Sequence, residues 1–132
     1  MIVVDTSALM AIVLDEPEAK RCMTALAEEP NLSISAVTIA EALIVAERRG
    51  VQAEMTDLLG GLGFAVETAD LSTAHGVADA YRAWGKGVAP AGLNFGDCFS
   101  YQLARQHDCP LLFVGDDFTR TDIVVAGKAG PG

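Results

Sequence analysis

The sequence predicts an α/β fold in which helices cover both faces of a parallel β-sheet. Short apolar runs alternate along the chain with longer segments of helical periodicity, which is the order of β-strand and helix in such folds. The runs at 2–4 and 111–114 are continuously apolar. Strands buried on both faces of a parallel sheet have this pattern.

Composition indicates one globular domain. The chain has 132 residues, of which 51% are hydrophobic and 20% charged, values typical of a folded protein with one core. We expect residues 1–126 to form the domain and the glycine-rich residues 127–132 to form a flexible tail. No apolar run approaches the roughly 20 residues of a membrane span. The start of the chain lacks the basic region of a signal peptide, so we expect a cytoplasmic protein.

Four strands and a weaker fifth run account for the apolar segments. The strands are expected at 2–4, 32–35, 64–67 and 111–114, with one more β-like run at 123–125. The run at 32–35 alternates apolar and polar residues, and Gly115 stops the run at 111–114. The fifth run follows the last strand closely, before the tail.

Helical periodicity fills the segments between these strands. The helices are expected at 6–14, 17–29, 36–49, 52–62, about 71–84 and 95–107. Polar residues suited to capping precede four of them: Asp5 or Thr6, Ser35, Asp70 or Ser72, and Asn94. Pro17 suits the first position of the second helix, and Gly50 follows the third as a stop signal. A Gly/Pro/Ala loop at 85–92 separates the last two helices.

The net charge of −9 at neutral pH has the wrong sign for a protein that binds nucleic acid through basic residues alone. Either the acids form a solvated surface, or some of them cluster in one site and hold cations. The three cysteines, Cys22, Cys98 and Cys109, form no CxxC pair, and we expect reduced thiols.

Several acids occupy positions where a purely structural role is awkward. Asp5 ends the first strand, and Asp116 and Asp117 follow the last one, although a cap or a turn would explain each. Glu41 is the only charged residue between 36 and 46, where the helix is apolar on all sides and is therefore expected to be buried. Asp97 lies in the first turn of a predicted helix, where the helix dipole favours an anion.

A buried carboxylate needs a partner, because removing an unpaired charge from water costs several kcal/mol. Glu41 is therefore protonated, paired with a basic residue such as Arg82 or Arg105, or bound to a metal ion. The acids lack a matching set of cysteine or histidine residues, since His75 and His107 stand alone. Oxygen ligands without nitrogen or sulfur favour Mg²⁺ or Mn²⁺ over Zn²⁺. Phosphodiester hydrolysis fits such a site, since the chain has no GxxxxGK[ST] or GxSxG motif.

The order of these residues resembles that of the PIN-domain ribonucleases, and most closely the VapC-type toxins of bacterial toxin–antitoxin modules. The motifs that carry the resemblance are the strand ending in Asp5-Thr6-Ser7, Glu41 on a helix, NFGDC at 94–98, and LLFVGDDF at 111–118 followed by TDI at 121–123. It extends over residues 1 to about 125.

This resemblance implies a three-layer α/β/α PIN-like domain with a short parallel sheet of four to five strands. It implies an endoribonuclease toxin that uses Mg²⁺, or Mn²⁺, to activate water against a phosphodiester of tRNA or other structured RNA. It also implies a homodimer and a VapB-like antitoxin that neutralises the toxin. The alternative is a PIN-like module that binds RNA or a partner without cleaving.

The resemblance also implies roles for individual residues. Asp5 and Asp97 would bind the principal metal, and Glu41 would bind it through water or position the attacking water. Asp117 is the better match for the fourth acid, with the adjacent Asp116 as the alternative. The supporting positions are Thr6, Ser7, Asn94 and Ser100.

Contacts to RNA are a separate expectation. The basic candidates are Lys86, Arg82 and Arg48, with Arg49 and Arg105 as further choices. Lys86 is favoured because it lies in a loop bounded by glycines. Tyr81 and Trp84 either stack on a base or pack within the protein.

Overall fold

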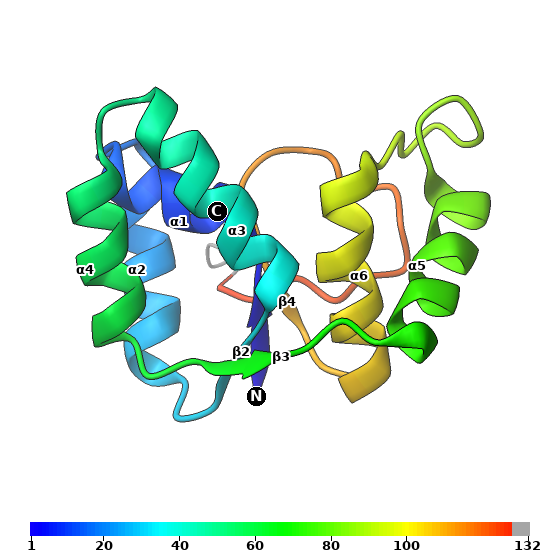
Figure 1. Ribbon diagram of the computed structural model, residues 1–132, viewed down its shortest axis with the longest axis horizontal. Coiled ribbons are helices and arrows are strands. Elements are labelled where there is room, and N and C mark those ends of the chain that lie inside the picture. Colours follow the sequence, from blue (N-terminus) through cyan, green and yellow to red (C-terminus); the bar gives the residue numbers. More distant parts are fainter. Residues whose placement is uncertain (128–132) are drawn as a thin grey trace.

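A four-stranded parallel sheet lies between two groups of helices in the computed structural model, which describes residues 1–127 (Figure 1). The strands are β1 (Ile2–Val4), β2 (Leu32–Ser35), β3 (Ala65–Glu67) and β4 (Leu111–Leu112), in the spatial order β3-β2-β1-β4. The helices are α1 (Thr6–Val13), α2 (Ala19–Glu28), α3 (Ala36–Arg48), α4 (Gln52–Gly61), α5 (Leu71–Trp84) and α6 (Phe95–His107). The predicted three-layer α/β/α fold is confirmed.

The alternation of side chains along the strands divides the core in two. Ile2 and Val4 point to a cluster with residues of α1, α2, α3 and α4. Val3 points to the opposite face and joins a cluster built mainly from α5 and α6. Successive side chains of a strand face opposite sides of a sheet, so a three-residue strand supplies both cores. In Figure 1 the two helical groups lie on the left and right of the strands.

The strand order places the end of β1 at the centre of the sheet. β1 pairs with β2 on one side, where Val3 lies opposite Ser33, and with β4 on the other, where Val4 lies opposite Leu112. All pairs are parallel, so the strands end at the same edge. In open α/β sheets ligands bind at this edge. Asp5, directly after β1, therefore occupies the middle of the edge where a site is expected.

Several predicted elements are shorter in the structure or absent. The run at 123–125 is not a strand: Val125 makes only an isolated bridge to Leu111. β4 ends at Leu112 rather than at 114, because the amide of Val114 donates to the hydroxyl of Ser7 instead of to a neighbouring strand. Pro17 lies outside α2, which begins two residues later. The expected tail lies, apart from Gly127, outside the described residues.

The prediction that α3 is buried on all sides is wrong. Its buried residues form a single stripe of Thr38, Ala42 and Ala46, which faces the body of the protein. Ala36 and Ala40 are exposed, Leu43 is 38% exposed and Ile44 is 54% exposed. The helix thus has an apolar outer surface, and the apolar pattern by itself did not show that this surface is open.

Cys22 and Cys98 are buried free thiols, and Cys109 is a partly buried one, as expected. Within residues 1–127, no helix combines the length and apolar character needed to cross a bilayer.

Candidate active site

Asp5 is buried, and both of its carboxylate oxygens accept hydrogen bonds. It caps the N-terminus of α1, where its Oδ2 accepts hydrogen bonds from the backbone amide of Ser7 at 3.1 Å and from the Ser7 hydroxyl at 2.7 Å. Its Oδ1 accepts a bond of 2.6 Å from the hydroxyl of Ser100 on α6. The side chain is a cap, as the structural interpretation expected, but it is also tied to a second helix. Three donors keep its position and orientation defined.

Glu41 extends from α3 to the start of α1 and is partly buried. Its Oε1 accepts a hydrogen bond of 2.7 Å from the hydroxyl of Thr6. Its carboxylate also packs against Gly96 so closely that a Cβ at position 96 would collide with Oε2 and lie 2.9 Å from Cδ. The carboxylate therefore occupies space that is open only because residue 96 is a glycine.

The basic partners considered for Glu41 bind elsewhere. Arg82 donates to Asp79 at 2.7 Å, and the Arg105 guanidinium lies 3.8 Å from Asp122. The proposed ion pair between Glu41 and either arginine is therefore absent from the structure. The negative charge of Glu41 is supported instead by a neutral hydroxyl.

Asp97 lies in the first turn of α6 and is only 8% exposed. It forms a reciprocal capping box with Asn94: the Asp97 amide donates to Asn94 Oδ1 at 2.8 Å, and the Asn94 amide donates to Asp97 Oδ2 at 3.0 Å. Burial raises the pKa of Asp97 to about 7, against the lowering effect of the Asn94 amide. The charges of Asp5, Asp117 and Glu41 contribute to this raised pKa. The charges of three other carboxylates at this edge thus act on Asp97.

Asp116 and Asp117 are both exposed after β4. Asp117 is the member of the pair whose charge raises the pKa of Asp97, so its carboxylate lies within electrostatic reach of the buried acid. The backbone carbonyl of Asp116 accepts hydrogen bonds from the amide of Thr119 at 3.1 Å and from its hydroxyl at 2.6 Å. Of the two, Asp117 is therefore the better candidate for the fourth acid.

The structure brings the four supporting candidates to the acids. Thr6 contacts Glu41, Ser7 and Ser100 contact Asp5, and Asn94 contacts Asp97. The basic candidates are less central, since Lys86 and Arg48 are exposed and Arg82 is held by Asp79.

Sequence reasoning missed two features of the site. Gly96 was not assigned a role, although a glycine directly before a candidate acid in a helix was the available signal. The contact between Tyr101 and Asp122 was also missed, because it joins residues that share no local pattern.

The chemistry of the donors fits a hard divalent cation. Within residues 1–127, no ion pair involves Asp5, Glu41, Asp97 or Asp117. The first three of these acids accept hydrogen bonds from hydroxyl or amide groups instead. In the same range, no three histidine, cysteine, aspartate or glutamate side chains lie close enough to form a metal site as they stand. Oxygen donors are the ligands that Mg²⁺ and Mn²⁺ prefer. The residues present therefore fit such an ion, with adjustment of their side chains.

The chain matches the PIN domain family over residues 2–124. It is 42% identical over 124 residues to a ribonuclease VapC of Mycolicibacterium smegmatis, covering 92% of this chain and 96% of the relative. It is 43% identical over 125 residues to ribonuclease VapC42 of Mycobacterium tuberculosis, covering 92% and 95%.

Solved structures share the fold. VapC20 of Mycobacterium tuberculosis, described as a toxin that cleaves the sarcin–ricin loop, superimposes with a TM-score of 0.76 at 16% identity, covering 94% of this chain and 97% of that one. A toxin–antitoxin complex from Klebsiella pneumoniae superimposes with a TM-score of 0.73 at 19% identity, covering 97% and 98%. With the family match and relatives above 40% identity along nearly the whole chain, this protein belongs to the PIN domain family and, within it, to the VapC type.

Proposed function

We propose that this protein is a metal-dependent endoribonuclease toxin. The observation that carries the proposal is the placement of four acids at one edge of the sheet, where the charges of Asp5, Glu41 and Asp117 act on the buried Asp97. The names of the relatives, which are ribonucleases, support the reaction class. A site of oxygen donors at the carboxyl ends of parallel strands suits hydrolysis of a phosphodiester.

Each acid has a proposed role that follows from its surroundings. Asp5 and Asp97 bind the principal Mg²⁺ or Mn²⁺, because they are the two buried acids. Glu41 binds through water or orients the attacking water, since Thr6 already holds one of its oxygens. Asp117, exposed and on a loop, completes the site or holds a second ion. Asp116 is the alternative for this fourth position.

A bound divalent ion would lower the pKa of water and offset charge on the phosphate. The protein itself supplies orientation. Ser7 and Ser100 hold the two oxygens of Asp5, while Gly96 leaves the space that Glu41 occupies. These contacts restrict the side chains of Asp5 and Glu41, which lowers the cost of orienting both acids for an in-line reaction.

The proposed substrate is tRNA or other structured RNA. With a net charge of −9, affinity for phosphates depends on the cation and on a few basic residues placed near the site. Lys86 is the favoured contact, because it is exposed in the loop that leads to Asn94 and α6. Arg48, also exposed, is a second contact, and Arg82 would first have to leave Asp79.

We also propose a homodimer and a VapB-like antitoxin. Several structural neighbours are toxin–antitoxin complexes, including one from Klebsiella pneumoniae and VapBC2 from Rickettsia felis bound to a promoter DNA fragment. The exposed apolar side of α3, with Leu43 and Ile44, follows Glu41 directly and would suit contact with a protein chain.

Incubation of the purified protein with total tRNA tests the reaction. Cleavage is expected with Mg²⁺ or Mn²⁺, and not with EDTA or with Asp97→Asn. Equal cleavage in all these samples would identify a contaminant and reject the proposal. Tight RNA binding without cleavage under any metal condition would favour the alternative, a non-cleaving PIN-like module. Expression should also arrest growth unless the antitoxin is co-expressed.

A further inference from the structure

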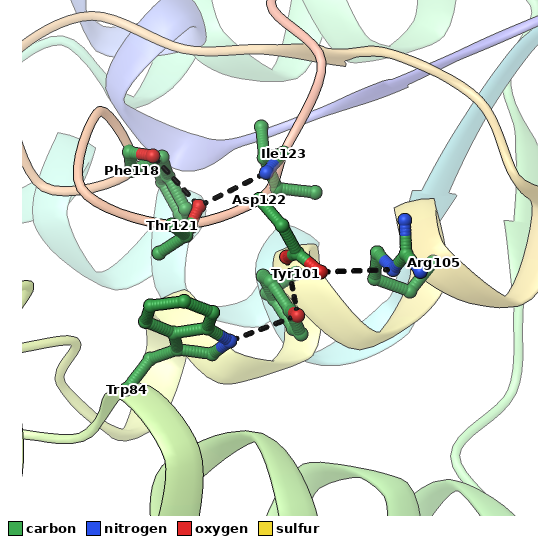
Figure 2. A network of polar contacts seen from close by, with 7 residues as sticks. All are labelled: Trp84, Tyr101, Arg105, Phe118, Thr121, Asp122 and Ile123. Carbon is green, nitrogen blue, oxygen red and sulfur yellow. Dashed lines mark hydrogen bonds and ion pairs between the residues drawn. The ribbon is translucent and has the colours of Figure 1, made fainter.

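A polar network joins α6 to the segment that follows β4. The hydroxyl of Tyr101 donates a hydrogen bond of 2.6 Å to Asp122 Oδ1, and Trp84 Nε1 donates to the same hydroxyl at 2.9 Å (Figure 2). The Arg105 Nε lies 3.8 Å from the other oxygen of Asp122. Tyr101 is only 9% exposed, and its hydroxyl contacts both partners with short bonds. The network joins α5, α6 and the chain after β4: its Tyr101 end is buried, whereas Asp122 and Arg105 lie at the surface, each with a side chain that is 48% exposed.

The segment from 115 to 122 carries the proposed fourth acid and is held at a few points. Phe118 is 2% exposed and packs on Phe113 with ring centroids 5.1 Å apart. The Thr121 hydroxyl donates to the Phe118 carbonyl at 2.7 Å and accepts from the Ile123 amide at 3.2 Å, as Figure 2 shows. These bonds make 118–123 one locally bonded unit. Asp117 directly precedes that unit, so its position depends on where the unit is fixed.

Asp122 is the point at which this unit is tied to α6. On that helix Asp97, Tyr101 and Arg105 follow one another at intervals of four residues, so they lie along one face. Ser100, the residue directly before Tyr101, donates a hydrogen bond to Asp5. Helix α6 thus carries the buried acid Asp97 and two hydroxyl groups that act on other segments. The Ser100 hydroxyl donates to Asp5, and the Tyr101 hydroxyl donates to Asp122 in the segment that carries Asp117.

The hydroxyl of Tyr101 is suited to this role. Burial and the hydrogen bond to Asp122 raise its pKa above the usual value, so it remains a neutral donor across the physiological range. A hydrogen bond from a neutral hydroxyl to a carboxylate is short and stronger than one between neutral groups.

We propose that Tyr101 and Asp122 are positioning residues, whose hydrogen bond ties the segment at 115–122 to α6 and holds Asp117 toward Asp97 for divalent cation binding. This inference rests on the proposed metal-dependent function. Neither residue contacts the cation in this arrangement, and both act through Asp117.

Binding of Mn²⁺ to the full chain, measured by calorimetry without RNA, tests the proposal. Tyr101→Phe keeps the ring and removes the donor, and it should weaken Mn²⁺ binding about three- to tenfold. The matched control is Tyr81→Phe, because the Tyr81 hydroxyl donates to the Lys86 carbonyl rather than to a residue of the segment at 115–122. This control should bind Mn²⁺ as the wild type does. Circular dichroism verifies that each variant is folded.

A double-mutant cycle separates positioning from a general loss of structure. In an Asp117→Asn background, Tyr101→Phe should have little further effect on Mn²⁺ affinity, because the acid it positions has been removed. An equal loss in both backgrounds, or wild-type affinity of Tyr101→Phe, would overturn the proposal while leaving the metal site intact. Failure of the wild type to bind Mn²⁺ would instead overturn the proposed function and this inference together.

Changes at Asp122 provide a second route that does not alter α6. Asp122→Ala should weaken Mn²⁺ binding as Tyr101→Phe does, whereas Asp122→Asn keeps an acceptor oxygen and should restore most of the affinity. In metal-free protein, amide hydrogen exchange of residues 115–123 should be faster in Asp122→Ala than in Asp122→Asn. Identical exchange and identical Mn²⁺ affinity in these two variants would contradict the positioning role.

Discussion

The hydroxyl of Ser100 donates a hydrogen bond of 2.6 Å to Asp5 Oδ1, although the two residues are 95 positions apart in the chain. Both side chains are buried, Ser100 completely. The bond connects the centre of the sheet to α6, the helix that also carries Asp97. Two of the proposed metal ligands are thereby held by the same helix.

Replacing Ser100 with alanine should weaken both stability and activity. The substitution removes a hydrogen bond to a charged acceptor, and we expect a loss of about 1.5–3 kcal/mol in the free energy of unfolding. RNA cleavage should fall at least about tenfold, because Asp5 loses the donor that orients one oxygen. Urea denaturation and tRNA cleavage measure the two effects. Ser72→Ala, at an exposed position of α5, is the control and should change neither. Unchanged cleavage by Ser100→Ala would show that Asp5 needs no such support.

Gly96→Ala should separate activity from stability. A Cβ at this position would displace the carboxylate of Glu41, which is the far end of a flexible side chain and can move at little cost. Alanine is also a better helix former than glycine by about 1 kcal/mol. We therefore expect cleavage to fall about tenfold or more, with the free energy of unfolding unchanged or slightly higher.

The matched control is Gly60→Ala on α4, where an added Cβ meets no atom within 4 Å. This variant should gain stability and keep full activity. Wild-type cleavage by Gly96→Ala would show that the position of Glu41 is unimportant for the reaction.

The pH dependence of stability should report the burial of Asp97. Burial and neighbouring charges raise the pKa of Asp97 to about 7 in the folded protein, whereas an unfolded chain has a value of about 3.9. Between these two pKa values the folded state binds a proton that the unfolded state has lost. The free energy of unfolding therefore falls as the pH rises toward 7. Asparagine does not titrate, and its oxygen can still accept from the Asn94 amide.

In metal-free buffer with EDTA, Asp97→Asn should therefore gain stability relative to the wild type as the pH rises. We expect the difference in free energy of unfolding to be about 2–3 kcal/mol larger at pH 8 than at pH 5. Urea denaturation at both pH values measures this difference in the free energy of unfolding. Asp57→Asn, on the exposed side of α4, is the control. A difference independent of pH would mean that Asp97 titrates normally.

Lys86→Ala should weaken RNA binding through one lost phosphate contact. The backbone carbonyl of Lys86, which accepts from the Tyr81 hydroxyl, is retained in this variant. In an Asp97→Asn background, which prevents cleavage, the slope of log affinity against log salt should fall by about one. Lys20→Ala, exposed on α2, is the control and should leave the slope unchanged. An unaltered slope for Lys86→Ala would remove this residue from the RNA interface.

Much of the fold could be predicted from local pattern. Apolar runs, caps and glycine stops involve residues within one or two turns of each other, so their effects are visible in the sequence. Ser35, Asp70 and Asn94 cap their helices as expected. The interpretation of α3 failed because apolar residues alone do not show which side of a helix other elements cover.

The sequence by itself determined the α/β order, the caps, and the placement of Asp5 and Asp97 at the ends of a strand and the start of a helix. Only the tertiary structure decided that Ser100 holds Asp5, that Gly96 makes room for Glu41, and that Tyr101 meets Asp122. The physical reason is range: backbone propensity and capping act between near neighbours, whereas these contacts arise when packing of two cores on one sheet brings distant segments together.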